Sequence, residues 1–229
     1  MKKHVPNIFT LGNLFCGAIG IVFVFQDNLI WGAMMIWAGA VLDFFDGFMA
    51  RILNVKTLIG KELDSLADMV TFGLLPSFII FYYLKLSTSN VYIPFLAFLI
   101  AIFSALRLAK FNVDERQTTS FLGLATPASA FFVSAIPFYY ELPNFTSFVN
   151  VYILLAITVF LSYLMISEIS LFSFKFSGIK WQQDKWKIIF ALLSLVLFAS
   201  FQALSFPLII LSYLIFSKLD NKKNEKPVE

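Results

Sequence analysis

The 229-residue sequence contains one cysteine, Cys16, and one histidine, His4. A single cysteine excludes an intramolecular disulfide, and the shortage of sulfur and imidazole ligands argues against a Cys/His zinc site or a Ser-His-Asp triad. Charged residues are also scarce, at 14% of the chain. Any chemistry must therefore use carboxylates, amides, hydroxyls and the few Lys and Arg side chains.

Long apolar runs are what the sequence has in abundance. Hydrophobic residues make up 59% of the chain, and 29 residues are phenylalanine. No signal-peptide leader precedes the first run, so we treat the whole sequence as mature protein. We predict an all-α membrane protein, a polytopic bundle of about eight transmembrane helices with a six-helix core and a C-terminal hairpin.

The runs also give the expected position of each helix. The last run, residues 188–216, would be about 43 Å long as one helix, which exceeds the ~30 Å hydrocarbon core. Pro207 and the two residues before it should break it into a hairpin. The six earlier helices are expected at 6–25, 29–51, 61–84, 91–109, 122–140 and 148–166.

The distribution of basic residues predicts the orientation. If the N-terminal head is cytoplasmic, helix alternation places the connections beginning at Arg51, Lys110 and Glu168, and the C-terminal tail, on the same side. These regions hold all of the 17 Lys and Arg residues except Lys85. The positive-inside rule therefore predicts that both termini are cytoplasmic.

Four aspartates lie at the ends of two otherwise apolar helices, where unpaired charge is expensive. At about 100° per residue, each helix presents its acidic and small residues on one stripe. The two helices are joined by a short connection, so the stripes can face each other. The members are Asp43, Asp46, Gly47 and Ala50 on the first helix, and Gly60, Asp64 and Asp68 on the second.

Carboxylates that converge in this way cannot all ionise without cations. Aspartate is a natural ligand of hard divalent ions, and two ions about 3.5 to 4 Å apart commonly assist phosphoryl displacement. The pattern favours two such cations here. The alternative is that the aspartates form interfacial salt bridges with Arg51, Lys56 and Lys61.

This stretch resembles the signature of the CDP-alcohol phosphatidyltransferases, D-x2-D-G-x2-A-R-x8-G-x3-D-x3-D, and every position from Asp43 to Asp68 is filled. The opening Pro6-Asn7, Thr10 and Asn13 are similar to the entry helix of that family, although such a polar stripe could also serve as helix–helix contact. The resemblance implies a multi-pass enzyme that uses CDP-diacylglycerol.

A second resemblance concerns the acceptor alcohol. The segment from Arg107, Arg-Leu-Ala-Lys-Phe-Asn, and the later Gly-Leu-Ala-Thr-Pro-Ala look like the phosphatidylserine synthase branch, with departures at Lys110 and at Ala125-Thr126. Arginine binds a carboxylate bidentately, as serine would require. Arg107 and Lys110 are therefore candidates for serine binding. Alternatively, both side chains reach the membrane interface or lipid phosphates.

The family resemblance implies a role for each motif residue. Asp43, Asp46, Asp64 and Asp68 would hold two cations, Mg²⁺ or Mn²⁺, and Asp68 would also be catalytic, taking the proton from the serine hydroxyl. The residues expected to contact CDP-diacylglycerol are Asn7, Thr10, Gly47, Ala50, Arg51 and Gly60.

The sequence thus predicts transfer of a phosphatidyl group from CDP-diacylglycerol to L-serine in the cell membrane, with a cytoplasmic active site, a homodimer and no nucleic-acid partner. A sibling transferase that uses glycerol 3-phosphate or an inositol compound, and a cation transporter, remain alternatives. The expected divisions are a catalytic membrane domain at 1–167, a basic interfacial loop and hairpin at 168–217, and a polar cytoplasmic tail at 218–229.

Overall fold

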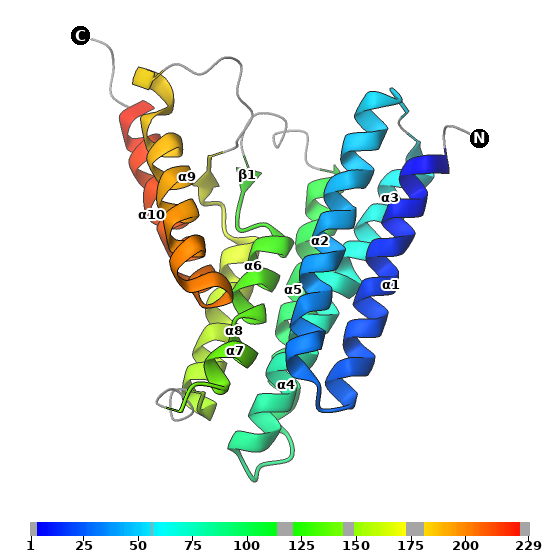
Figure 1. The fold of residues 1–229 in the computed structure, drawn as a ribbon, viewed down its shortest axis with the longest axis vertical. Helices are drawn as coiled ribbons and strands as arrows, with labels where there is room; N and C mark the ends of the chain where they lie inside the picture. The colour runs from blue at the N-terminus through cyan, green and yellow to red at the C-terminus, as the bar shows by residue number, and fades with distance from the viewer. Residues whose placement is uncertain (1–3, 56, 114–120, 144–148, 173–180, 225–229) are drawn as a thin grey trace.

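The computed structural model describes residues 4–55, 57–113, 121–143, 149–172 and 181–224 (Figure 1). The described chain is almost entirely helical. Its α-helices are α1 (Val5–Phe25), α2 (Leu29–Ile52), α3 (Leu58–Asp68), α4 (Leu75–Ser87), α5 (Leu99–Val113), α6 (Thr126–Ser134), α7 (Ile136–Tyr140), α8 (Val151–Ile166), α9 (Trp181–Phe201) and α10 (Phe206–Asn224). A π-helical segment, Met69–Leu74, joins α3 to α4, and 3₁₀ segments at Ile93–Phe98 and Gln202–Ser205 precede α5 and α10.

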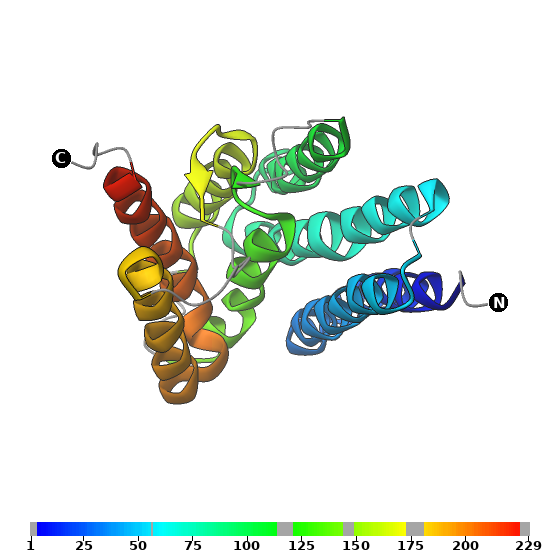
Figure 2. The same cartoon turned by 90° about the horizontal axis from the view of Figure 1, so that it is seen from above.

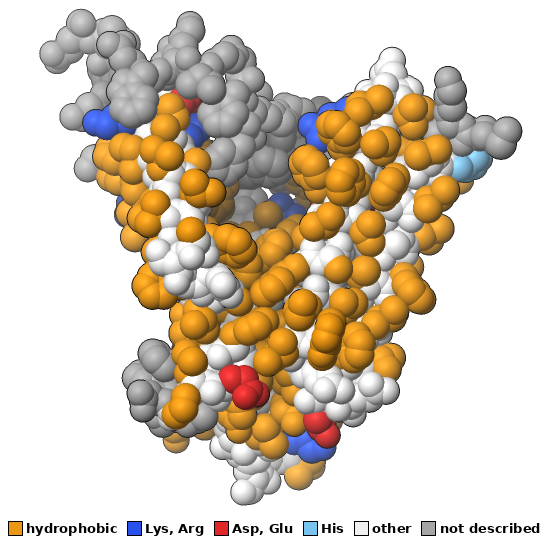
Figure 3. Space-filling model, in the orientation of Figure 1, with side chains coloured by type: hydrophobic (Ala, Val, Ile, Leu, Met, Phe, Trp, Pro, Cys, Tyr) orange, Lys and Arg blue, Asp and Glu red, His pale blue; other side chains and the backbone are white. Residues whose placement is uncertain are grey.

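Five stretches of the described chain are helical, long and apolar enough to cross a membrane, which makes this a multi-pass membrane protein. They are Val5–Phe25, Leu29–Ile52, Leu58–Ser87, Ile93–Val113 and Asp184–Asn221. Hydrophobic side chains cover much of the face of the bundle that Figure 3 shows. The predicted all-α polytopic bundle is confirmed.

The last of these stretches folds back on itself, as predicted. α9 ends at Phe201, and α10 returns beside it (Figures 1 and 2). The reversal lies at Gln202, whose φ of 48° is left-handed, a few residues before the predicted break. Pro207 then occupies the first turn of α10, where its missing N–H removes no helical bond.

The long helix Leu58–Ser87 forms the centre of the bundle. It runs between the α1–α2 pair and α5 (Figure 2). In its most apolar stretch 56% of the residues are buried, against 28% for α1, so it packs on several sides where α1 also faces lipid. Phe72, Leu75 and Ile79 are fully buried there. This helix carries two of the four aspartates, the half-buried Asp64 and the buried Asp68.

An aromatic group attaches the C-terminal hairpin to this core. The Trp37 ring on α2 stacks on Phe138 of α7, with centroids 5.4 Å apart, and meets the edge of Phe206 of α10 at the same distance. The indole Nε1 of Trp37 donates a hydrogen bond to Ser134 Oγ at 2.9 Å. The hairpin is therefore packed against the middle of α2, away from the acidic end.

Two predicted boundaries each differ from the observed one by four residues. The fifth helix begins at Thr126, not Leu122, because Phe121–Leu122 forms a short strand, β1, antiparallel to β2 (Ser170–Leu171). Gly123 permits the turn into the helix, with φ of 73° and its N–H bonded to the Ile169 carbonyl oxygen.

The second boundary is the end of the fourth predicted helix. α5 continues to Val113 instead of ending at 109, since side chains of α3 contact its last turn, as described below.

The three predicted divisions are not tested by the fold. Residues 173–180, the centre of the predicted interfacial loop, lie outside the described residues, and α9 already begins at Trp181. The polar tail is also partly helical, because α10 extends to Asn224. The divisions and the full count of eight spans stay predictions, since α6 and α7 are short helices of 9 and 5 residues.

Candidate active site

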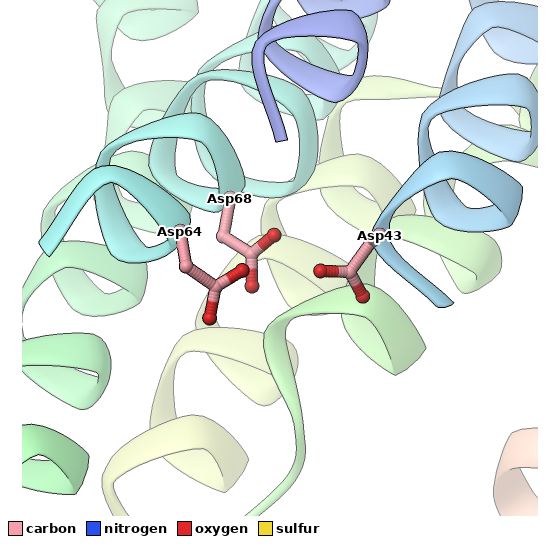
Figure 4. A group of neighbouring side chains, drawn as sticks. All are labelled: Asp43, Asp64 and Asp68. Carbon is pink, nitrogen blue, oxygen red and sulfur yellow. The ribbon is translucent and has the colours of Figure 1, made fainter. Parts of the chain in front are cut away.

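Three aspartates converge between α2 and α3. Asp43 comes from α2, while Asp64 and Asp68 lie one turn apart on α3 (Figure 4). One carboxylate oxygen from each lies within 4.8 Å of the others. The 3.6-residue helical period makes this possible, since it places residues four apart on the same face. α3 is continuous from Leu58, as the predicted second stripe requires.

Asp46 occupies a neighbouring position. It is 7% exposed, and its Oδ2 accepts a hydrogen bond of 2.7 Å from Thr10 Oγ1 on α1. It does not belong to the group of three carboxylates that approach within 4.8 Å. The structure therefore brings three of the four predicted ligands together and places the fourth one turn along α2.

Asp68 has its own partner from α1. It is 9% exposed, and its Oδ1 accepts a hydrogen bond of 3.1 Å from Asn13 Nδ2. The polar stripe of α1 thus faces the acidic residues, with Thr10 contacting Asp46 and Asn13 contacting Asp68. Sequence analysis identified this stripe but not its partners.

Within the described part of the chain, the carboxylates form no salt bridge with a basic side chain. Arg51 instead donates from Nε to the Gly47 carbonyl oxygen at 3.0 Å, and Lys61 donates to the Asn112 carbonyl oxygen at 2.7 Å. Lys56 lies outside the described residues. The salt-bridge alternative is therefore not supported by Arg51 or Lys61.

The chemistry of this group suits a divalent cation. Asp64 Oδ1 is buried and has no hydrogen-bond partner in the described chain. A buried anionic oxygen without a donor is costly, and a hard cation coordinated by oxygen would satisfy it. Asp43, Asp64 and Asp68 can therefore hold a metal ion.

A pocket of about 480 Å³ opens beside the acidic residues. It lies between the start of α1, the end of α2 and the start of α3. Gly47 contributes open space, because a Cβ atom there would meet nothing within 4 Å. The lining residues are Pro6, Asn7, Thr10, Asp46, Gly47, Ala50, Val55, Thr57, Leu58, Gly60, Lys61 and Asp64.

Five of the six residues predicted to contact CDP-diacylglycerol line this pocket. Arg51 is the exception, since its side chain is exposed and folds back onto Gly47. Sequence analysis missed Thr57 and Lys61. Thr57 caps α3, its Oγ1 accepting from the Gly60 N–H at 3.0 Å, and the Thr-x-x-Gly spacing at a helix start was the available signal.

The two predicted serine-binding residues have different environments. Arg107 on α5 is 7% exposed, its guanidinium lies 5.6 Å from the Phe111 ring centroid, and its Nε has no hydrogen-bond partner among the described residues. It is close enough to Asp68 for their charges to interact. Lys110 is exposed. Reaching out to the membrane interface therefore fits Lys110 and not Arg107.

The end of α5 is tied to α3. Asn112 Nδ2 donates to Ser65 Oγ at 2.9 Å, and its carbonyl oxygen accepts from Lys61. These contacts explain why α5 extends past the predicted end, and they connect the helix that carries Arg107 to the helix that carries Asp64 and Asp68.

Comparison with known proteins finds a family model that covers most of the chain. Residues 3–164 match the family model described as CDP-alcohol phosphatidyltransferase. The chain is 37% identical over 178 residues to the CDP-diacylglycerol–serine O-phosphatidyltransferase of Bacillus subtilis (strain 168), covering 76% of this chain and 92% of that protein.

Two further relatives are informative. The Helicobacter pylori (strain ATCC 700392 / 26695) protein of the same name is 32% identical over 202 residues, covering 87% of this chain and 84% of its own. A CDP-diacylglycerol–glycerol-3-phosphate 3-phosphatidyltransferase from Aquifex aeolicus (strain VF5) is 40% identical, but over only 79 residues, 34% of this chain and 44% of its own. The chain belongs to the CDP-alcohol phosphatidyltransferase family.

Proposed function

We propose that this protein transfers a phosphatidyl group from CDP-diacylglycerol to L-serine, giving phosphatidylserine and CMP. The observation that carries the proposal is the group of three converging aspartates beside the pocket. The relatives that align over most of their length are named serine O-phosphatidyltransferases. In this reaction the serine hydroxyl oxygen bonds to the phosphorus that carries diacylglycerol. The bond from that phosphorus to the CMP oxygen breaks, and CMP leaves.

The aspartates would hold two divalent cations, Mg²⁺ or Mn²⁺. Asp43, Asp64 and Asp68 supply one group of oxygens, and Asp46, one turn away from Asp43, adds another. When bound, such cations neutralise the diphosphate and stabilise the charge on the attacking and leaving oxygens. Asp68 would also accept the serine hydroxyl proton on a carboxylate oxygen.

The pocket beside Asp46 would receive the cytidine diphosphate part of the donor. Asn7 and Thr10 present polar side chains to it, while Gly47, Ala50 and Gly60 leave room for the nucleotide near the backbone. A contact between Arg51 and the nucleotide stays a prediction. It would require the side chain to leave the Gly47 carbonyl oxygen.

Arg107 is our candidate for the serine carboxylate. A buried arginine with an unpartnered Nε in a membrane bundle is costly unless it meets an anion. A serine bound there would keep its hydroxyl near the acidic group, because Arg107 and Asp68 interact electrostatically. Lys110 could assist only from the exposed end of α5.

The two alternatives have less support. A glycerol 3-phosphate transferase would need further basic residues for the second phosphate, and the similarity to the Aquifex aeolicus protein covers only a third of the chain. In a transporter the carboxylates would be expected near the bilayer midplane, whereas here they lie in the second half of α2 and in the first half of helix Leu58–Ser87.

CMP release by the purified full-length protein tests the proposal. The assay would contain CDP-diacylglycerol and Mg²⁺ or Mn²⁺ in detergent, and would compare L-serine with glycerol 3-phosphate and inositol compounds. We expect release with L-serine only. Release with another alcohol would overturn the acceptor assignment, and no release with any acceptor would favour the transporter.

We also propose that both termini and the active site are cytoplasmic, that the protein lies in the cell membrane, and that it is a homodimer. The positive-inside distribution supports the orientation. Protease accessibility of the C-terminal tail in sealed vesicles would test it, and light scattering of the detergent complex would give the oligomeric state.

A further inference from the structure

Asn13 connects α1 to the point where α3 passes into the π-helical segment. Its side chain is fully buried, and its Nδ2 donates to Asp68 Oδ1 at 3.1 Å. Its backbone carbonyl oxygen accepts a hydrogen bond of 2.9 Å from Thr71 Oγ1. Asp68 is the last residue of α3, and Thr71 lies within Met69–Leu74. One residue of α1 therefore contacts the chain on both sides of this junction.

α2 closes over the same contact. A Cβ atom on Gly39 would lie 2.5 Å from Thr71 Cγ2 and 2.8 Å from Asn13 Oδ1, so only glycine allows this approach. Gly39 is four residues before Asp43, on the same face of α2. The packing of Asn13, Thr71 and Gly39 thus sets the position of Asp43 relative to Asp68.

The chemistry of an amide suits this position. A lysine or arginine would neutralise Asp68 and compete with a cation, whereas an amide donor orients the carboxylate and leaves its charge available. Partners of this kind orient metal ligands in many proteins, and π-helical segments are frequent at functional sites. The alternative is that the contacts only hold the helices together.

We propose that Asn13 is a positioning residue for Asp68, held in place by Thr71 of the π-helical segment. The inference rests on the proposed role of Asp68 as a cation ligand. It predicts that losing either contact weakens metal binding, in addition to any effect on stability.

Mn²⁺ titration of the full-length protein in detergent is the primary test, because it does not depend on turnover. Asn13→Leu has similar size but no donor. We expect its Mn²⁺ dissociation constant to rise about 10- to 100-fold, the usual effect of removing a partner of a metal ligand. The rate of CMP release should fall in the same variant, expressed per folded molecule.

A second pair of variants decides the question if Asn13→Leu does not fold. Thr71→Val keeps the shape but removes the hydroxyl, and Thr71→Ser keeps the hydroxyl. We expect weaker Mn²⁺ binding in the first and recovery in the second. Thr158→Val is the matched control, since Thr158 is equally buried but bonds only the Leu154 carbonyl oxygen within α8.

Three outcomes separate this inference from the proposed function. Unchanged Mn²⁺ affinity in Asn13→Leu and Thr71→Val, with only a lower melting temperature, would overturn the positioning role. Wild-type protein that binds no Mn²⁺ would overturn it too. Wild-type protein that binds Mn²⁺ but releases no CMP with serine would refute the proposed function, while the variants would still test the role of Asn13.

Discussion

Both ends of the bundle carry acidic residues and a pocket, but the acidic residues of the two ends have different surroundings. At one end, Asp46 and Asp68 are 7% and 9% exposed beside a pocket of about 480 Å³. At the other end, Asp27 and Glu141 are exposed and line a pocket of about 430 Å³ together with several aromatic rings. Pocket size does not distinguish these ends.

Access to water does distinguish them. Asp27 lies in the turn after α1, with φ of 61°, and Glu141 directly follows α7, so water can solvate both carboxylates. The aspartates of the other end lie within helices and meet across a helix–helix interface. An exposed carboxylate needs no partner, whereas converging carboxylates that are buried or half-buried can all ionise only beside a cation. Convergence together with reduced access to water therefore identifies the site.

Replacement of one aspartate at each end should give the largest difference in turnover number. We expect Asp68→Asn to lower the turnover number about 10²- to 10⁴-fold, the usual contribution of a general base. Binding of CDP-diacylglycerol should be largely retained. Asp27→Asn, the matched change at the opposite end, should leave turnover unchanged. CMP release and donor binding would be measured on both, and equal losses would remove the distinction between the ends.

Asp43→Asn tests whether Asp43 and Asp68 have separate roles in the candidate site. Asp43 is proposed to hold cations without moving a proton, so its replacement should weaken metal and donor binding together. Isothermal titration with Mn²⁺ and with CDP-diacylglycerol would show this. If Asp43→Asn and Asp68→Asn lose donor binding to the same extent, the two residues do not have separate roles.

Arg107→Lys tests whether the buried guanidinium group of Arg107 binds the acceptor serine. Lysine keeps the charge but loses the planar, bidentate donor pair. We expect the KM for serine to rise about 10- to 100-fold, as for loss of a hydrogen bond to a charged group, with little change in the KM for CDP-diacylglycerol. Lys110→Gln, on the exposed end of α5, is the control and should change the serine KM far less.

Much of the fold could be predicted because apolar runs and turn residues are local signals. The second helix was expected at 29–51 and is observed at Leu29–Ile52. The fifth helix was misplaced because β1 depends on a partner strand about fifty residues later. The N–H of Gly123 bonds the distant Ile169 carbonyl oxygen, and no local pattern in the sequence reveals that contact.

The candidate site also combines features that local spacing predicts with contacts between distant residues that it does not predict. Helical spacing predicted that the four aspartates could meet, and three of them do, while Asp46 lies one turn along α2 from Asp43. The partner of Asn13 could not be predicted, since Asp68 is 55 residues away and the contact depends on how closely α1, α2 and α3 pack. The folded-back side chain of Arg51 is likewise set by geometry at the helix end.

Substitutions of two glycines of α2 should have the smallest effects. They test whether the pocket beside the aspartates also needs open space near the backbone. Gly39→Ala should lower the free energy of unfolding by about 1–3 kcal/mol, because its Cβ would overlap Thr71 and Asn13. Gly47→Ala meets no atom within 4 Å and should stabilise the helix by up to about 1 kcal/mol. Its methyl group would instead occupy the pocket and raise the KM for CDP-diacylglycerol. Thermal unfolding and the KM for CDP-diacylglycerol, measured on both variants, would check that one substitution affects stability and the other affects donor binding. A Gly47→Ala enzyme with unchanged donor KM would mean that the open space beside Gly47 is not where the nucleotide binds.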